Sequence, residues 1–345
     1  MATYKGIQGS TVQSLSADPP GAQSSGQLWY NSTSNVWKIT SEGTGAWASG
    51  GAVPGTGLQG WPGSAGTVTA ALTIGGITSI AESGTYINES YEYDGTSWGT
   101  EVSMNRDTGA YTQGLGTQTA AISGGYYRST TTPAPTGVLN VSESYNGVAW
   151  TTTNPTQNAL GIRTGCGTLT AGLEAGGTDV TPTVSGVSES FDGTTWADVA
   201  SLNTSRSGAA QHNGTLTASF CIGGGTPTIV GVVEEFNGTG WTETTAINTP
   251  RKGVMGSGTT ALALIYAGEV PSNSPIASIL TESWNGTSWT EVADLTTGRG
   301  GGGSAGTTNT GALCISGATG LSPGYTTSTE VWASPNYAVE TVTTS

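Results

Sequence analysis

The feature that most constrains this chain is a sequence unit that recurs along it. A pair of small residues, usually Gly-Gly, follows an apolar segment six times, at intervals of 44 to 52 residues. The pairs begin at Gly75, Gly124, Gly176, Gly223, Ala267 and Ser316. Self-similarity at this period is typical of solenoids and propellers, whose units bury their apolar faces by packing on neighbouring copies. We therefore expect one repeat fold.

Each copy continues in a similar way after its small-residue pair. A glutamate two residues before an aromatic residue comes first, and in five copies an Asp-Gly or Asn-Gly turn and a tryptophan follow. The glutamates are Glu89, Glu143, Glu189, Glu234, Glu282 and Glu330, and the tryptophans are Trp98, Trp150, Trp196, Trp241 and Trp289. Asp-Gly or Asn-Gly between short aromatic segments is a strong sign of a β-hairpin. The unit is thus predicted to be a small β-sheet with its tryptophan buried against a neighbour.

The sixth copy lacks its last strand, because Trp332 is followed by Ala333, Ser334 and Pro335 with no further turn. The segment around Trp47, ahead of the first copy, has the character of the missing strand. A strand there would close the ring and remove two edges that are prone to aggregation. We predict six four-stranded blades in residues 43–335, an N-terminal attachment segment in residues 1–42 and a C-terminal tail in residues 336–345.

These repeats resemble those of the kelch family, in which an apolar strand ending in Gly-Gly joins an aromatic strand and then a tryptophan. The resemblance covers about residues 43–335. It implies an all-β propeller whose innermost strands line a central channel. It also implies that the loops between second and third strands share a face with the connections between blades. Kelch propellers include oxidases, adaptors and carbohydrate binders, so the resemblance implies a fold and no single activity.

Charge and composition restrict the partners and the chemistry. Nine Lys and Arg against 23 Asp and Glu give a formal charge of −14, which disfavours nucleic acid and anionic lipid surfaces. The single histidine, His212, disfavours most metal and nucleophilic sites, including the copper site of the kelch oxidases, which uses two histidines. No apolar run approaches a membrane span, and the first residues do not resemble a signal peptide. We expect a non-enzymatic protein without metal, cofactor or membrane insertion.

An arginine recurs ahead of five of the small-residue pairs. The positions are Arg106, Arg163, Arg206, Arg251 and Arg299, whereas the first copy has Trp61, Pro62 and Gly63 nearby instead. Such regularity indicates a structural ion pair with the glutamate of each copy. The alternative is a ring of cations that binds anions at the mouth of the channel.

The loops between the small-residue pair and the glutamate differ most among the copies, and loops on a rigid scaffold carry most recognition chemistry. The longest spans residues 126–140. Because aromatic faces stack on sugars and arginine donates hydrogen bonds, these loops are predicted to contact a glycan or a protein. The candidates are Tyr86, Tyr126, Tyr127, Arg128, Asp179, Glu269 and Tyr325. The alternative is that the tyrosines pack on the propeller.

Residues 1–42 lie outside the repeat and contain an aromatic hairpin, with the strands LWYN from Leu28 and VWKI from Val36. The motif Gly-x-Leu-Trp-Tyr-Asn resembles N-terminal segments of structural proteins of tailed bacteriophages, especially marine and cyanobacterial ones. That resemblance implies attachment to other virion proteins. The implied contact residues are Leu28, Trp29, Tyr30, Val36 and Trp37. The alternative is a hairpin that packs on the propeller.

Together these features lead us to expect a non-enzymatic virion structural protein on the tail or capsid surface. It would be a tail fibre, a tail-associated appendage or a capsid decoration within a homo-oligomeric or symmetric assembly. The propeller would be displayed for receptor binding to a host surface glycan or protein. The alternative is a carbohydrate-binding or carbohydrate-active propeller unrelated to a virus.

Overall fold

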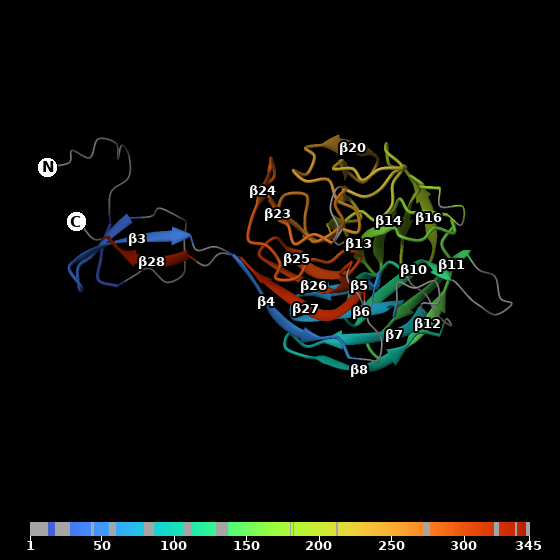
Figure 1. The fold of residues 1–345 in the computed structure, drawn as a ribbon, viewed down its shortest axis with the longest axis horizontal. Helices are drawn as coiled ribbons and strands as arrows, with labels where there is room; N and C mark the ends of the chain where they lie inside the picture. Colours follow the sequence, from blue (N-terminus) through green and yellow to red (C-terminus); the bar gives the residue numbers. More distant parts are fainter. Residues whose placement is uncertain are drawn as a thin grey trace. The chain divides into compact units, whose positions relative to one another are not determined.

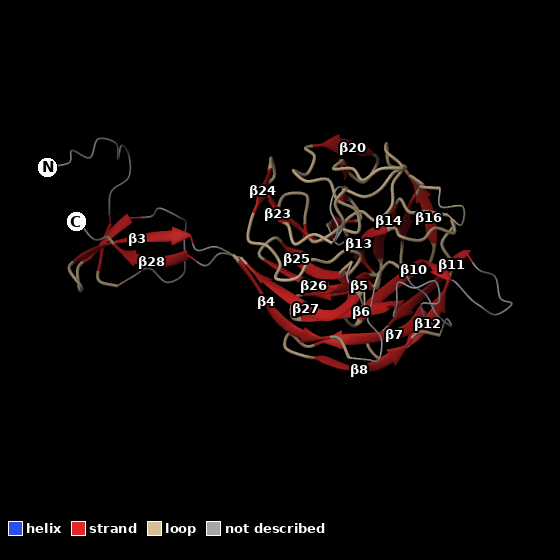
Figure 2. Cartoon of the chain, viewed as in Figure 1, coloured by secondary structure: helices blue, strands red, loops and turns tan. Residues whose placement is uncertain are grey.

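The computed structural model describes residues 13–17, 28–42, 45–54, 60–78, 86–105, 112–128, 137–179, 181, 183–211, 213–271, 277–320, 324–334 and 337–342. These residues form strands, turns and loops, and none of them is helical (Figure 2). They contain seven four-stranded sheets. The chain divides into two compact units, one made of Met1–Ala46 with Ser334–Ser345 and the other of Trp47–Ala333.

Five of the six sheets in the larger unit use four consecutive strands. The first is β5 (Gly63–Thr67), β6 (Ala70–Ile77), β7 (Tyr86–Tyr93) and β8 (Trp98–Ser103), and the second is β9 (Leu115–Thr117), β10 (Ala120–Arg128), β11 (Gly137–Tyr145) and β12 (Trp150–Thr153). The third is β13 (Thr164–Thr168), β14 (Ala171–Ala175), β15 (Ser188–Phe191) and β16 (Trp196–Val199). The fourth is β17 (Gly214–Thr215), β18 (Ala218–Ile222), β19 (Val233–Phe236) and β20 (Trp241–Thr244), and the fifth is β21 (Met255–Gly258), β22 (Ala263–Tyr266), β23 (Thr281–Trp284) and β24 (Trp289–Glu291).

The sixth sheet joins distant parts of the chain. Its strands are β25 (Gly303–Thr308), β26 (Gly311–Ala318), β27 (Tyr325–Ala333) and, from the N-terminal side, β4 (Ala46–Ala52). The predicted strand at Trp47 therefore supplies the outer strand that the sixth copy lacks. Trp47 is buried, and its Nε1 donates a hydrogen bond to Thr281 Oγ1 in the fifth sheet over 3.1 Å.

The sheets of the larger unit are arranged around a common centre, with β5 and β13 towards the inside and β8, β16 and β20 at the outside (Figure 1). The first strands contact one another in order: β5 with β9, β9 with β13, β13 with β17, β21 with β25, and β25 with β5. A bridge between Asn213 and Gly258 joins the fourth sheet to the fifth. The larger unit is thus an all-β, propeller-like fold.

Glycine allows the inner strands to approach this closely. A Cβ added at Gly114 would lie 2.3 Å from the carbonyl oxygen of Ser64 in the neighbouring sheet, and one at Gly165 would lie 2.6 Å from the side chain of Leu115. A side chain at Gly114 would collide with the backbone of Ser64, and one at Gly165 would have to displace the side chain of Leu115. Part of the large glycine content, 56 residues, therefore serves close packing of backbones around the axis.

The Asp-Gly and Asn-Gly turns join third to fourth strands as predicted. In the fourth sheet, Asn237 Oδ1 accepts hydrogen bonds from the backbone N–H groups of Thr239 and Gly240, each over 3.0 Å, and Gly238 has a φ of 90°. Asparagine thus stabilises the turn through its side chain, and glycine supplies the left-handed backbone.

The structure corrects the sequence alignment of the first copy. Tyr93 pairs with Trp98 in the first sheet, as Tyr145 pairs with Trp150 in the second. The neighbouring strands show the same register, which places Tyr91, rather than Glu89, at the position of Glu143. Tyr91 is buried, and its hydroxyl donates to Glu89 Oε2 over 2.7 Å. A buried tyrosine therefore takes the place that glutamate has in the other copies.

The smaller unit is one four-stranded sheet of β1 (Gln13–Leu15), β2 (Leu28–Asn31), β3 (Val36–Glu42) and β28 (Tyr337–Thr341). Strands β2 and β3 form the predicted hairpin, with Tyr30 opposite Trp37. Strand β28 pairs antiparallel with β3, so the prediction of a separate C-terminal tail was wrong. The physical reason is that a two-stranded hairpin alone is only marginally stable, and further strands give it a sheet that buries side chains.

Two shortened chains test the role of β4. Residues 43–335 retain this strand, residues 52–335 lose it, and both omit the strands of the smaller unit. We expect the shorter chain to aggregate or to melt at a lower temperature, because β27 would become an exposed edge. Size-exclusion chromatography and thermal unfolding of both chains check this. Equal monomer content and equal Tm would contradict the role assigned to β4.

Candidate functional site

The loops after the second strands and the connections that enter the first strands lie on one face of the larger unit. Isolated β-bridges join them within single sheets. The bridged pairs are Gly60 with Ile77, Gly161 with Thr178, Ser207 with Gly225, Lys252 with Glu269, and Gly300 with Ala318. This arrangement agrees with what the kelch resemblance implies for the loops.

Just after these bridges, one residue from each of five sheets lies near the axis. We call these five residues the axial belt: Trp61, Ile162, Gly208, Gly253 and Gly301. The N–H of Gly208 donates to the carbonyl of Ile162, Gly253 to Gly208, Gly301 to Gly253, and Trp61 to Gly301, over 2.6 to 3.0 Å. All five have a left-handed φ, from 52° at Trp61 to 65° at Gly208. That conformation suits glycine and is unfavourable for tryptophan and isoleucine.

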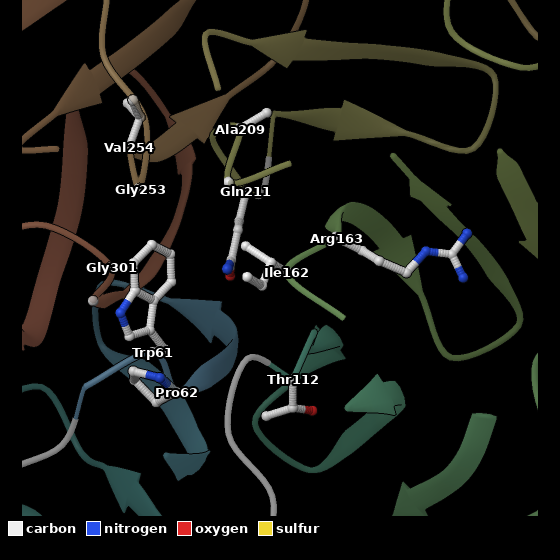
Figure 3. Close-up of a pocket in the computed structure, with 12 residues that line it drawn as sticks. Trp61, Pro62, Thr112, Ile162, Arg163, Ala209, Gln211, Gly253, Val254 and Gly301 are labelled. Carbon is white, nitrogen blue, oxygen red and sulfur yellow. The ribbon is translucent and has the colours of Figure 1, made fainter. Parts of the chain in front are cut away.

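A pocket opens at the axial belt, and we call it the axial pocket. Its lining includes Trp61, Ile162, Arg163 and Gln211 together with the glycines of the belt. In Figure 3 the indole of Trp61, the side chain of Ile162 and the amide of Gln211 point towards the space between them, whereas Arg163 points away. The cavity volume is about 20 Å³, which is room for little more than one water molecule.

Two glycines form the seat of the Trp61 indole. A Cβ added at Gly301 would lie 2.4 Å from the indole, and one at Gly253 would lie 3.0 Å away. Gly60, the residue before Trp61, packs against Tyr325, because a Cβ added at Gly60 would lie 2.1 Å from the Tyr325 ring. Close packing therefore holds the half-buried indole at Gly253 and Gly301, and holds the backbone next to it at Gly60.

Tyr325 is only 4% exposed, contrary to the predicted exposed contact with a glycan. It packs with Ile77, Trp61 and Tyr86 and supports the axial pocket from below the surface. Burial, with the charges of Tyr86 and Glu269 nearby, raises the pKa of Tyr325 to about 12. Its phenol is consequently neutral at physiological pH.

The other predicted loop residues have separate surroundings. Glu269 forms an ion pair with the partly exposed Lys252, with 3.2 Å between Oε2 and Nζ. Asp179 accepts hydrogen bonds from the Thr181 hydroxyl and from the N–H groups of Thr181 and Thr183, which lower its pKa and order its own turn. Strand β10 contains Tyr126, Tyr127 and Arg128, but their side chains, and residues 129–136, lie outside the described residues.

The recurrent arginines form buried ion pairs with glutamates of their own sheets. The pairs are Arg163 with Glu189, Arg206 with Glu234, Arg251 with Glu282 over 2.7 Å, and Arg299 with Glu330 over 2.5 Å. All four arginines are at most 2% exposed, so the alternative of an open cation ring does not apply to them. Arg106 lies outside the described residues.

Each of these glutamates also holds the connection that enters its sheet. Glu282, for example, accepts hydrogen bonds from the backbone N–H groups of Asn248 and Thr249. The bridges at Gly161 and Ser207 occupy equivalent positions in the third and fourth sheets, so Leu160 is the structural equivalent of Arg206. Arg163 therefore reaches Glu189 from a position three residues further along the chain. The ion pair is therefore retained although the arginine has moved by three residues.

The tryptophans of the repeat join neighbouring sheets. Trp47, Trp98, Trp150, Trp196, Trp241 and Trp289 are all buried. The Nε1 groups of Trp150, Trp196 and Trp241 donate to Ser90, Ser142 and Ser188, respectively, over 2.9 to 3.2 Å. Because each serine lies in the preceding sheet, every such bond fixes two sheets to each other.

The predicted attachment residues of the smaller unit fall into two groups. Trp29 is 1% exposed and so belongs to the interior of this unit, contrary to the prediction of a contact. Leu28, Tyr30 and Val36 are half-buried. Trp37 is 45% exposed and packs edge to face on Tyr30, with ring centroids 5.4 Å apart.

A residue that the sequence analysis missed lies beside Trp37. Val342 is 38% exposed, and its N–H donates to the carbonyl oxygen of Trp37 over 2.9 Å. We call Tyr30, Trp37 and Val342 the apolar patch. No local signal in the sequence connects its two parts, because they come from opposite ends of the chain.

The described residues contain no group of three or more His, Cys, Asp and Glu side chains that could hold a metal ion. The three cysteines are unpaired and buried, and burial raises the pKa values of Cys166 and Cys314 to about 12. Among the described residues no helix has the length and apolar character needed to cross a membrane.

Comparison with known proteins gives one kind of match. No protein-family profile and no curated protein is similar to the chain. The solved structure of YjhT superposes with a TM-score of 0.68, covering 85% of this chain and 99% of that chain at 14% sequence identity. Likeness at this identity concerns the fold alone. It supports a propeller-like, all-β architecture for this protein.

Proposed function

We propose that this protein is a non-enzymatic structural protein of a tailed phage virion, serving as a tail fibre, a tail-associated appendage or a capsid decoration. In this proposal the smaller unit attaches to the particle and the larger unit is displayed for contact with a host receptor or glycan. The observation that carries the proposal is that both ends of the chain form a sheet of their own, outside the repeat, with apolar side chains exposed. The phage assignment rests on the resemblance of the hairpin that starts at Leu28.

Within this proposal, the six sheets of Trp47–Ala333 are the blades of one kelch-like propeller. The seventh sheet, β1-β2-β3-β28, is the attachment module. The cyclic order of contacts between first strands supports the count of six, as does the use of β4 in the last sheet. The rigid blades would present the loop face to the host receptor or glycan. The attachment module would bind the virus particle.

The apolar patch is the proposed attachment contact. Trp37 and Val342 are two of the five large hydrophobic side chains that are exposed in the described residues, and they are neighbours. Clusters of exposed apolar side chains mark sites at which a protein binds a partner. Repetition of the contact around a symmetric particle would strengthen it through avidity.

A double variant tests the attachment. We expect Trp37→Ser with Val342→Thr to remain folded, because both side chains are exposed, and to be incorporated at several-fold lower copy number in phage particles. Quantitative mass spectrometry of purified particles measures the copy number. Val148→Thr is the matched control, since Val148 is 78% exposed but lies in the larger unit. Normal incorporation of the double variant, or absence of the unaltered protein from particles, would overturn the proposal.

A second candidate function is a carbohydrate-binding propeller unrelated to a virus. The loop face of the larger unit favours it, because loops on a rigid scaffold carry most recognition chemistry. Mass spectrometry of the particles separates the two candidates. A glycan-binding protein that is absent from virions would favour the second.

A further inference from the structure

We infer that the smaller sheet acts as a latch that keeps the larger unit closed. In the sixth sheet, β4 and β27 come from opposite ends of the chain, and we call their pairing the seam. Strands β3 and β28, which lie between the seam and the two termini in sequence, pair with each other in the smaller sheet, and we call that pairing the latch. The inference follows from strand pairing and goes beyond the proposed attachment to a particle.

The seam is held differently from the equivalent pairings of the other five sheets. In those sheets the third and fourth strands are consecutive, so a turn connects them. At the seam, the N–H of Val53, just past β4, donates to the carbonyl oxygen of Thr327 near the start of β27 over 2.8 Å. The two strands are therefore antiparallel. The other end of the seam lies at Ala46 and Ala333, where the chain leaves the larger unit in both directions.

Fraying of that end would expose Trp47, the second residue of β4. Trp47 is buried, with its ring centroid 4.8 Å from that of Tyr266 and 5.5 Å from that of Trp332. Its hydrogen bond to Thr281 joins the sixth sheet to the fifth. Strand ends open more readily than strand centres, so the seam opens most easily at the residue that holds these two sheets together.

The latch restrains this end of the seam. Residues 43–45 link β3 to β4, and residues 334–336 link β27 to β28. Pairing resumes directly after these links, with Glu42 opposite Tyr337, and Figure 1 shows β3 beside β28 and β4 beside β27. Such short links keep two separated strand ends at a high effective concentration, so a frayed end pairs again instead of moving away. Wide opening of the seam therefore requires β3 to leave β28 as well.

The latch couples the stability of the seam to that of the smaller sheet. The free energy of opening the seam widely includes the free energy of opening the smaller sheet. A partner that binds the smaller sheet only in its closed form consequently stabilises the seam too. Under the proposed function, attachment to the particle would also keep the propeller closed.

A disulfide across the latch tests this coupling in the full chain. Lys38 and Thr341 lie opposite each other, and Lys38 Nζ donates to Thr341 Oγ1 over 2.9 Å. Opposite Cα atoms of antiparallel strands are about 4.5 to 5.5 Å apart, which is a distance that a disulfide can span. We expect Lys38→Cys with Thr341→Cys to cross-link on oxidation, whereas the three native cysteines are buried.

Hydrogen exchange followed by mass spectrometry measures opening of the seam. We expect the backbone amides of β4 to exchange roughly tenfold more slowly in the oxidised than in the reduced variant, because β3 then stays on β28. Strand β14 is the internal reference and should not change, since the third sheet consists of consecutive strands. The matched control is Leu28→Cys with Ile39→Cys, which joins β2 to β3 and leaves β28 free. Its oxidation should alter β4 exchange by less than about twofold.

A third variant of the full chain weakens the latch. Glu340 lies opposite Ile39 within β28, and proline is unfavourable in a paired strand, so Glu340→Pro should speed β4 exchange roughly tenfold. The cross-link carries the test if this variant does not fold. Unchanged β4 exchange after cross-linking, or failure of the first cysteine pair to cross-link in the folded chain, would overturn the inference. Neither outcome bears on particle attachment, which incorporation measures separately.

Discussion

Replacing Trp196 with alanine is expected to lower the free energy of unfolding of this protein by about 3 to 5 kcal/mol. The side chain is 2% exposed and packs on Phe191, with ring centroids 4.9 Å apart. Its Nε1 also donates to Ser142 Oγ in the preceding sheet over 3.2 Å. Alanine would therefore leave a cavity between two sheets and remove a hydrogen bond that joins them.

Urea unfolding followed by far-UV circular dichroism measures this loss without depending on tryptophan fluorescence. Val148→Ala serves as the control, because Val148 is 78% exposed and its truncation should change stability by less than about 0.5 kcal/mol. A loss below about 1 kcal/mol for Trp196→Ala would show that the repeat tryptophans do not hold the sheets together.

The second large effect is expected at the buried ion pairs. Arg251→Met should cost about 3 to 5 kcal/mol, because Glu282 would remain buried without its cation. Both side chains are fully buried, and Arg251 also donates to the carbonyl oxygens of Thr249, Ala267 and Leu280. Loss of the guanidinium thus leaves the charge of Glu282 uncompensated and removes a hydrogen bond from each of three carbonyl groups.

The neighbouring residue provides a matched control. Lys252 forms the ion pair with Glu269, but its side chain is 43% exposed, so Lys252→Met should cost less than about 1 kcal/mol. Adding Glu282→Gln to Arg251→Met should recover part of the loss, because the uncompensated charge disappears. Both results come from the same urea titrations. Equal losses for Arg251→Met and Lys252→Met would contradict the proposed importance of burial.

The correct alignment of the first copy has a signal in the sequence that became clear only from the pairing of the strands. Tyr145, Phe191, Phe236 and Trp284 each precede their turn tryptophan by five residues, and so does Tyr93. That spacing, rather than the Glu-Ser-aromatic string at Glu89, identifies the true match of the first copy. Trp61 stands out where the first copy lacks an arginine, but its place beside Gly253 and Gly301 depends on the closed ring.

The sequence by itself determined the repeat, the hairpin turns and the partner of the incomplete last sheet. These features follow from local chemistry: Asn-Gly and Asp-Gly select a turn, aromatic residues favour strands, and the missing outer strand has one replacement at Trp47. Tertiary structure alone decided the pairing of β28 with β3, the burial of Trp29 and exposure of Trp37, and the placement of Trp61 and Gln211 around one pocket. Those contacts join residues from different strands or sheets, and their energies depend on register and burial, which no short stretch of sequence encodes.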